Sequence, residues 1–439
     1  MNYEPVIGIE VHVELNTKTK MFCRCSADYF GKEPNTHTCP VCLGLPGALP
    51  YANEEAIKKC IQIGLALGCT VNEQSYFERK NYFYPDLAKG YQISQLVKPL
   101  NINGQLTLDN GKVIRINRAH QEEDTAKLSH LGGVTTIDFN RSGVPLVEVV
   151  TEPDFTSSEE VRDYAKKLQQ IFRYLGVSNA DMEKGDMRLE ANVSVRGLNG
   201  YPLGGGQDLP NYRVELKNIN SFRFMVAAIE YEVKRQTEAL ERGETLTQET
   251  RGWNEKKKET YLQRSKEEAH DYRYFPEPDL PELSDMGQVL GIKGNEIELP
   301  SQKMDRFQNE YGLTRQQSST LAGPKDLATF FEKLVELGKE KNIAATQIAN
   351  YIINRKISTD ISPDQILDEI QSKGFGIISY ETELKKICKD VITEQTTAAA
   401  DYVSGRKAAL QSLIGGVMRK TAGKADAGKV RGLLTKMLK

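Results

Sequence analysis

The stretch that decides the fold is VIGIEVHVEL at residues 6–15. Apolar and polar residues alternate along it, so one face of a strand carries five aliphatic side chains and the other carries two glutamates and a histidine. The same alternation recurs at 187–196 and at 212–218. These segments predict a sheet with one buried face and one densely charged face. A charged face of this kind suits a platform over a polar ligand.

Helical patterns interrupt this β-rich region and then replace it. Three segments show the periodicity of amphipathic helices: 54–67, 158–175 and 222–242. From about residue 300 onward, apolar residues recur every three or four positions, which predicts an all-helical second half. We therefore predict the α+β class with three domains: a β-rich domain at 1–290, a helical linking domain at 291–370 and a helical tail domain at 371–439.

Composition narrows the class of protein. Charged residues make up 27% of the 439 positions. No apolar run approaches the roughly 20 residues that a membrane helix needs. The first residues lack the basic and apolar regions of a secretion signal. We expect a cytoplasmic protein without membrane contact, in which the seven cysteines are metal ligands or buried thiols rather than disulfides.

Four cysteines form the most specific local motif. Cys23 and Cys25 are followed, after thirteen residues, by Cys39 and Cys42. Two close pairs of sulfurs can close a tetrahedral zinc site, which leaves no open position for catalysis. We predict a structural Zn²⁺ that fixes the loop after the first strand. A CxC pair is less usual than CxxC, so His37 stays open as a replacement ligand, and four unrelated buried thiols are the plainer interpretation.

A second group of candidates combines carboxylates with imidazoles. His12 has Glu10 and Glu14 as its neighbours on the polar face, and a histidine opens the acidic run HQEED at 120–124. Glu148 lies inside an apolar run, where an unpaired buried carboxylate costs several kcal/mol. Oxygen ligands with one imidazole suit Mg²⁺ or Mn²⁺. Each residue alone is better explained by a solvated strand face than by a metal site, and spacing does not show that they converge.

Two further features concern nucleic acids and nucleotides. Aromatic and basic residues mix at 78–95 and 271–280, where they could bind phosphate and stack on a base or simply build a tyrosine-rich core. The net charge is −2, yet the segment from Ser404 to the end has nine basic residues and one acid. That imbalance favours RNA contact over a solvated helix face. The sequence has no P-loop motif, no GxSxG and no cysteine with a convincing His/Asn set, so we expect no amidase nucleophile.

Eight motifs in order resemble the GatB family. They are VIGIEVHVEL (6–15), RKNYFYPDLAKGYQISQ (79–95), HQEEDTAK (120–127), DFNRSGVPLVEVVTEPD (138–154), RLEANVSVR (188–196), ELKNINSF (215–222), QETRGW (248–253) and DYRYFPEPDL (271–280). The stretch 405–430 resembles the YqeY-like tail of that family. The resemblance implies a catalytic cradle of the GatB/GatE type, a helical linker and a small helical tail. The region from about 281 to 370 looks shorter than in other members.

The resemblance also implies an activity. Family members use ATP and Mg²⁺ to phosphorylate the side-chain carboxylate of misacylated Glu-tRNA(Gln) or Asp-tRNA(Asn). Ammonia from a GatA-type amidase then displaces the phosphate, while a GatC-type small subunit completes a heterotrimer. This division of labour explains the missing amidase nucleophile. A non-catalytic RNA-binding scaffold and a metal-dependent phosphohydrolase remain the alternatives.

Roles for individual residues follow from the resemblance. The expected catalytic residues are Glu10, His12, Glu123 and Glu148, of which the last three are the expected Mg²⁺ ligands. The expected zinc ligands are Cys23, Cys25, Cys39 and Cys42. The ammonia path or substrate site is expected to involve Lys80, Asp86, Lys89 and Arg273. The expected tRNA contacts are Arg406, Lys407, Arg419 and Lys420.

Overall fold

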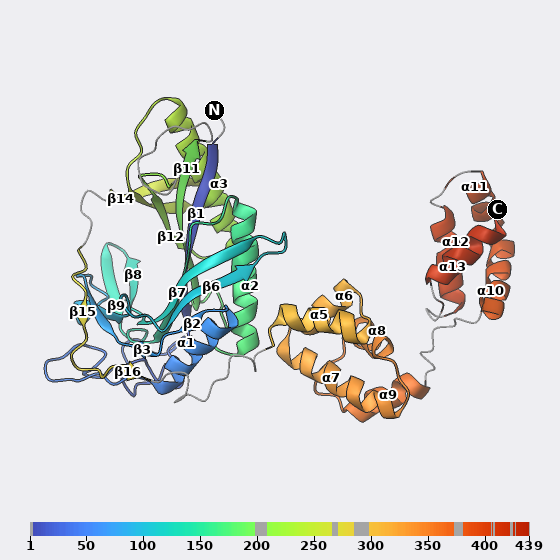
Figure 1. Cartoon of the computed structure of the whole chain (residues 1–439), viewed down its shortest axis with the longest axis horizontal. Coiled ribbons are helices and arrows are strands. Elements are labelled where there is room, and N and C mark those ends of the chain that lie inside the picture. Colours follow the sequence, from blue (N-terminus) through green and yellow to red (C-terminus); the bar gives the residue numbers. More distant parts are fainter. Residues whose placement is uncertain are drawn as a thin grey trace. The chain divides into compact units, whose positions relative to one another are not determined.

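The chain folds into two compact units, residues 1–300 and 301–439 (Figure 1). The computed structural model describes residues 3–197, 209–265, 271–284, 298–372, 381–404, 406, 409–421, 425 and 427–438. The first unit combines sheets with helices and the second is helical. The predicted α+β class is therefore confirmed.

A nine-stranded sheet is the frame of the first unit. Its strand order is β14-β13-β12-β11-β1-β10-β7-β6-β2. The strands are β1 (Tyr3–Glu14), β2 (Thr70–Val71), β6 (Asn101–Thr107), β7 (Val113–Glu123), β10 (Pro145–Thr151), β11 (Met187–Gly197), β12 (Val214–Ile219), β13 (Glu249–Asn254) and β14 (Glu259–Ser265). Neighbours are antiparallel except for the parallel pair of β12 and β13. The stretch at 6–15 lies in the central strand β1, which hydrogen-bonds on both sides.

Three helices pack on the apolar face of this sheet. They are α1 (Glu54–Ala66), α2 (Ser158–Leu175) and α3 (Phe222–Glu241), close to the predicted segments. Ile7, Ile9 and Val11 of β1 belong to one hydrophobic cluster with Val161 and Tyr164 of α2. Because successive residues of a strand point to opposite faces, burying this side directs the polar side chains of β1 to the other face.

Smaller sheets lie beside the large one. One has the strands β15 (Phe275–Pro276), β4 (Glu78–Asn81) and β5 (Tyr91–Ser94), and a second pairs β16 (Leu283–Ser284) with β3 (Gln74–Ser75). Phe275 pairs with Arg79, so the two aromatic and basic motifs lie together. The Arg79 guanidinium donates to Glu277 at 2.7 Å and lies 4.4 Å from the centre of the Tyr91 ring. This arginine therefore joins the two motifs.

The second unit contains two separate hydrophobic clusters. Helices α5 (Pro300–Tyr311), α6 (Arg315–Ala322), α7 (Lys325–Glu340), α8 (Ala345–Arg355) and α9 (Pro363–Ser372) supply the cluster from Phe307 to Ile370. Helices α10 (Glu381–Glu394), α11 (Thr396–Val403), α12 (Ala409–Lys420) and α13 (Ala427–Met437) surround the cluster from Leu384 to Leu434. The expected linker and tail boundary at 370/371 falls between the clusters, and the three domain limits stay a prediction. Among the described residues, no helix combines the length and apolar character required to cross a bilayer.

Candidate functional site

Strand register brings polar residues from four strands into one row. His12 of β1 lies opposite Glu148 of β10, and Glu148 lies opposite His120 of β7. On the other side of β1, His12 lies opposite Arg188 of β11. Directly paired residues point to the same face of a sheet, so all four side chains share the face that is not packed against the helices.

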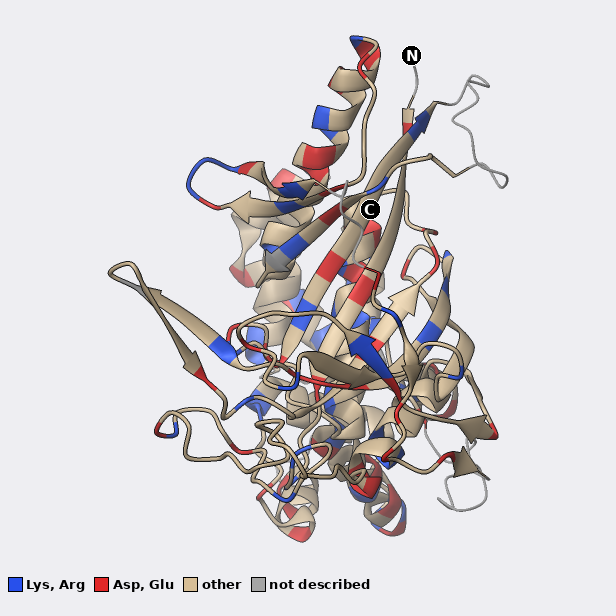
Figure 2. Ribbon diagram, turned by 90° about the vertical axis from the view of Figure 1, so that its left-hand side faces the viewer, with Lys and Arg blue, Asp and Glu red and all other residues tan. Residues whose placement is uncertain are grey.

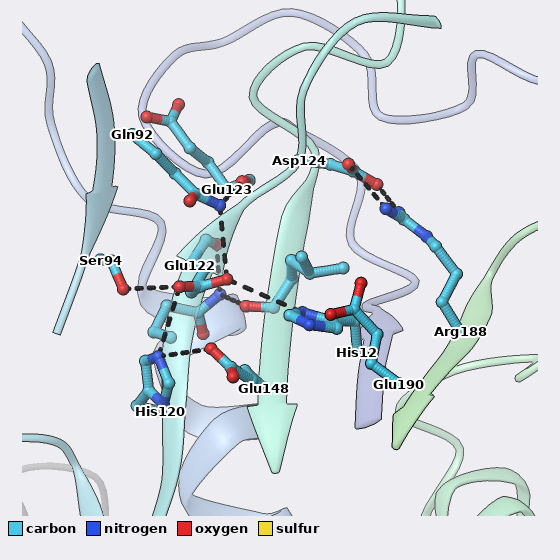
Figure 3. Close-up of polar contacts among 12 residues, drawn as sticks. His12, Gln92, Ser94, His120, Glu122, Glu123, Asp124, Glu148, Arg188 and Glu190 are labelled. Atoms are coloured by element: carbon cyan, nitrogen blue, oxygen red, sulfur yellow. Dashed lines mark hydrogen bonds and ion pairs between the residues drawn. The ribbon is translucent and has the colours of Figure 1, made fainter. Parts of the chain in front are cut away.

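Three side chains of this region form a group that could hold a metal ion. One ligand atom from each of His12, Glu122 and Glu148 lies within 4.8 Å of the others (Figure 3). The Nδ1 atom of His12 is 3.8 Å from a Glu122 oxygen. Both carboxylates are buried, with 1% and 6% of Glu122 and Glu148 exposed. Two carboxylates and an imidazole are a donor set that fits Mg²⁺ or Mn²⁺.

Glu123, which we expected as the third ligand, lies outside this group. Its two carboxylate oxygens accept from Lys89 Nζ at 2.5 and 2.6 Å, and one of them also accepts from the Ile93 amide at 2.9 Å. Adjacent residues of a strand point to opposite faces, so when Glu122 points toward His12, Glu123 points away. The structure thus places Glu122 where the sequence analysis placed Glu123. Counting by twos from His120 along β7 would have selected Glu122.

His120 is a second residue that the motifs did not single out for this site. Its Nε2 atom lies 3.2 Å from Glu148 and 3.3 Å from Glu122, and its ring is buried. Burial opposes the charged imidazole, but the Glu148 and Glu122 carboxylates outweigh it and raise the pKa of His120. This histidine therefore lies within hydrogen-bonding distance of both carboxylates, which favour its protonated form.

The two carboxylates are in turn held in their ionised form. Burial alone would raise the pKa of Glu148, but His120, His12 and Lys80 bring that pKa well below its ordinary value. Against burial and the Glu148 charge, Lys80 and His120 lower the pKa of Glu122 to about 2. Ionised carboxylates are the form that binds a cation.

Lys80 reaches the group from the neighbouring sheet. Burial would lower its pKa, but Glu122 and Glu148 raise the pKa of Lys80 above its ordinary value. The Nζ atom lies 5.2 Å from the centre of the Tyr272 ring. Lys80, expected near the ammonia path or the substrate, therefore faces the two buried carboxylates as a cation.

The other residues expected on that path lie elsewhere. Lys89 is the partner of Glu123, as described above. Asp86 accepts from the Thr125 hydroxyl at 3.0 Å and so ties its loop to the segment that follows β7. Arg273 is exposed, has φ of 43°, and its carbonyl accepts from Asn81 Nδ2 at 2.9 Å. Among the described residues, no hydrogen bond or ion pair joins Asp86 or Arg273 to Glu122 or Glu148.

Glu10 extends the acidic face toward β11. One ligand atom from each of Glu10, His12 and Glu190 also lies within 4.8 Å of the others. Burial first, then Glu148 and Glu190, raise the pKa of Glu10. Asn192 donates to Glu10 at 2.9 Å. Beside it is a cavity of about 420 Å³, whose lining includes Gly8, Glu10, Asn192, Ser194 and Tyr212.

The four cysteines come together as predicted. Their sulfurs lie within 4.8 Å of one another, and this group does not include His37. Lys20 is fully buried, with Nζ 3.7 Å from the Cys42 sulfur and 2.8 Å from the His37 carbonyl. A hydrogen bond from Cys23 and, against the effect of burial, the charge of Lys20 lower the pKa of Cys42 to about 5. Such a sulfur is a thiolate at neutral pH, as a zinc ligand must be.

The loop that carries the cysteines packs against the acidic site. Gly44 follows the second cysteine pair with φ of 64°, and a Cβ atom there would lie 2.9 Å from the Lys89 Cα atom. Only glycine fits such a close approach in the left-handed region. A metal in the cysteine group would therefore fix the segment that presents Lys89 to Glu123.

Comparison with known proteins decides the family. Residues 5–289 match the family model of the GatB/GatE catalytic domain, and residues 314–438 match the model of the GatB domain. The chain belongs to the GatB family. The resemblance stated from the motifs, including the type of its catalytic domain, is therefore confirmed.

Curated relatives of this GatB-family chain extend over its full length. It is 41% identical to the B subunit of the aspartyl/glutamyl-tRNA(Asn/Gln) amidotransferase of Persephonella marina, over 100% of both chains. It is 42% identical to the protein of the same name from Thermotoga maritima, over 100% of this chain and 99% of the relative. The Persephonella alignment spans 485 positions against 439 residues here, a difference of 46, so that relative has segments which this chain lacks.

The basic tail of the GatB-family chain presents cations on its surface. Arg406, Arg419 and Lys420 are exposed, and Lys407 lies outside the described residues. Arg406 pairs with Asp401 at 3.3 Å, and Lys420 pairs with Glu394 at 2.5 Å. Exposed pairs of this kind contribute little energy, about 0–1 kcal/mol, so they can be exchanged for phosphate contacts.

Proposed function

We propose that this chain is the carboxylate-activating subunit of an aspartyl/glutamyl-tRNA amidotransferase, a ligase that forms a C–N bond. The terminal phosphoryl group of ATP passes to the side-chain carboxylate of misacylated Glu-tRNA(Gln) or Asp-tRNA(Asn), which gives an acyl phosphate and ADP. Ammonia attacks the acyl carbon, the bond to the phosphate oxygen breaks, and inorganic phosphate leaves with the proton that the nitrogen loses, so the carboxylate has become an amide. Full-length relatives at 41–42% identity carry the name of such a subunit, which supports the proposal.

The observation that carries the proposal is the group of the half-buried His12 and the buried carboxylates Glu122 and Glu148. These residues would hold Mg²⁺ or Mn²⁺, which supplies the positive charge that transferred phosphoryl oxygens need. Lys80 would add a fixed cation on the same side, and its position in a largely water-free site strengthens its effect. His120 keeps Glu122 and Glu148 in place when the cation is absent. A non-catalytic RNA scaffold would have no use for such a buried set.

The proposal includes partners and a second metal. An amidase subunit of the GatA type releases ammonia from glutamine, and a small subunit of the GatC type completes the heterotrimer in the cytoplasm. The names of the relatives, each of which is one subunit of a larger enzyme, and the absence of an amidase motif in this sequence support this arrangement. The cysteine group would hold a structural Zn²⁺. The basic tail would bind the tRNA through Arg406, Lys407, Arg419 and Lys420.

A test is amidation of misacylated tRNA by the complete complex, with His12→Ala and Glu148→Gln as variants. Both should lose ATP-dependent amidation by more than about a hundredfold while tRNA affinity stays within about twofold, because neither residue is among those proposed to bind the tRNA. We call His12, Glu122 and Glu148 the metal group. Amidation by either variant at the unmodified rate would overturn the metal assignment. ATP hydrolysis without any tRNA requirement would instead favour the phosphohydrolase.

A further inference from the structure

A two-stranded arm connects β7 and β10, the strands that carry Glu122 and Glu148. It consists of β8 (Lys127–Leu131) and β9 (Val134–Asp138), joined by Gly132-Gly133, and its strands form a sheet of their own. Figure 2 shows it projecting from the rest of the unit. Among the arm residues whose burial is described, none is buried, and Val134 is 63% exposed. An isolated two-stranded hairpin is at best marginally stable in water. A partner that covers this arm would therefore stabilise it.

The arm is uncharged between its ends. Lys127 and Asp138 pair across its base, and residues 128–137 contain no Lys, Arg, Asp or Glu. A surface that grips RNA needs cations for the phosphates, as the tail of this chain has. The central part of a protein interface, in contrast, is depleted of charge. Among the described residues the hairpin pairs with no further strand, so apart from the Ile137 carbonyl, which accepts from Asn35 at 3.1 Å, its edges offer backbone groups that another protein's strand can extend. The composition therefore fits a protein partner and not an RNA.

The base of the arm is fixed to the cysteine loop, and the segments at its two ends are joined to each other. The Asn35 amide donates to Asp138 at 3.0 Å, and the Phe139 amide donates to the Asn35 side chain at 2.8 Å. Arg141 donates to the Thr125 and Ala126 carbonyls, both at 2.9 Å. The arm begins four residues after Glu123 and ends ten residues before Glu148. These contacts hold the root of the arm between β7 and β10, the strands that carry Glu122 and Glu148.

We propose that this arm is the docking element for the subunit that supplies ammonia. The inference rests on the proposed function, since only a chain without its own amidase needs such a partner. Docking at this arm would bring the partner to the segment that connects the strands of Glu122 and Glu148, the residues at which the acyl phosphate is proposed to form. The cysteine loop then has two structural roles, because it holds Lys89 against Glu123 and also holds the root of the arm.

The test uses the chain co-expressed with its amidase and small partner subunits. In one variant, residues 129–136 are replaced by Asn-Gly, so that Leu128 and Ile137 stay paired across a two-residue turn. In a second, Val134→Asp puts a charge on the arm. The matched control is Val113→Asp, at an exposed valine of β7 away from the arm. Complex formation is measured by size-exclusion chromatography and by affinity, and amidation is measured with glutamine and with ammonium chloride as nitrogen donors.

Both arm variants should bind the amidase at least about tenfold more weakly and lose glutamine-dependent amidation at low subunit concentration, because truncating a central contact commonly has that effect. Amidation with ammonium chloride and tRNA affinity should stay within about twofold, and Val113→Asp should behave as the unmodified chain. An arm variant that keeps full amidase affinity would overturn the inference. Reduced tRNA affinity with intact amidase binding would also overturn it and make the arm an RNA contact.

The two proposals fail in different ways. If the unmodified complex amidates misacylated tRNA with neither donor, the proposed function fails, while chromatography still reports whether the arm binds the amidase. If the unmodified complex amidates misacylated tRNA and the arm variants use glutamine as efficiently as it does, the arm inference alone fails. Circular dichroism and thermal unfolding of each variant identify any loss of fold. If shortening the arm unfolds the chain, the inference is decided by comparing the amidase affinity of Val134→Asp with that of Val113→Asp.

Discussion

Replacing neighbouring glutamates of β7 should have opposite consequences. Glu122→Gln removes one of two carboxylates from the metal group, whereas Glu123→Gln removes the charge that faces Lys89. We expect the first change to weaken metal binding with little effect on stability. We expect the second to destabilise the fold with little effect on metal binding.

The magnitudes follow from charge and burial. At 4 Å and an effective dielectric constant of about 20, each pair of unit charges contributes about 4 kcal/mol. Allowing half of this for the cost of desolvating Glu122 leaves about 2 kcal/mol, or roughly a thirtyfold loss of Mn²⁺ affinity. The neutral amide also relieves repulsion between Glu122 and Glu148, which offsets the lost attraction to Lys80. The unfolding free energy should therefore change by less than about 1 kcal/mol.

For Glu123→Gln the partner is a lysine of which only 12% is exposed. Leaving one member of a buried pair without its counter-charge typically costs about 3–5 kcal/mol. The amide oxygen can still accept from Ile93, so the lower part of this range is expected. Mn²⁺ binding followed by electron paramagnetic resonance, and urea unfolding of the metal-free chain, measure the two effects separately. A larger loss of Mn²⁺ affinity in Glu123→Gln than in Glu122→Gln would refute the reasoning.

Three other changes test separate parts of the account. Lys20→Met should lower Zn²⁺ affinity about 10–100-fold in chelator competition, because it removes a buried cation beside the Cys42 thiolate, and an unchanged affinity would contradict that role. Lys80→Met should reduce the amidation rate at saturating ATP by a larger factor than it reduces tRNA affinity. Equal losses in the two assays would instead assign Lys80 to tRNA binding. In the tail, Arg419→Gln with Lys420→Gln should reduce the slope of log affinity against log salt by about 0.7–0.9 per lost phosphate contact, whereas an unaltered slope would exclude these residues from the RNA contact.

The structure also governs how the tail is tested. Removing residues 404–439 would take away α12 and α13, whose Leu413 and Leu434 share a cluster with Leu384 of α10. Such a truncation exposes apolar surface and confuses unfolding with loss of RNA contact. Exposed cations at the end of α12 can be neutralised without touching this cluster.

Local periodicity was enough to predict much of the fold. The alternation at 6–15 identified the central strand, and the 3.6-residue patterns located α1, α2 and α3. The cysteine group was also predictable, since each short cysteine pair brings two sulfurs together by itself. In these cases the information lies within a few neighbouring residues.

The metal group depends on register between distant strands, which no local pattern contains. Glu148 meets His120 only because β10 pairs with β7 at that offset, and His12 meets Glu148 only through the pairing of β1 with β10. A shift by one residue reverses the face of every side chain in a strand. The resemblance suggested Glu123 from the acidic run, whereas the register of β7 turns Glu122 toward the group. Lys80 comes from another sheet altogether, and the sequence analysis could place it only by resemblance.

The central claim is that His12, Glu122 and Glu148 together bind the cation used in phosphoryl transfer. A crystal of the complex soaked in Mn²⁺ with a non-hydrolysable ATP analogue tests this directly through anomalous scattering. We predict an anomalous peak within about 2.0–2.6 Å of the His12 Nδ1 atom and of oxygens of Glu122 and Glu148. A peak bound to Glu123, or none near His12 while the nucleotide is bound, would contradict the account.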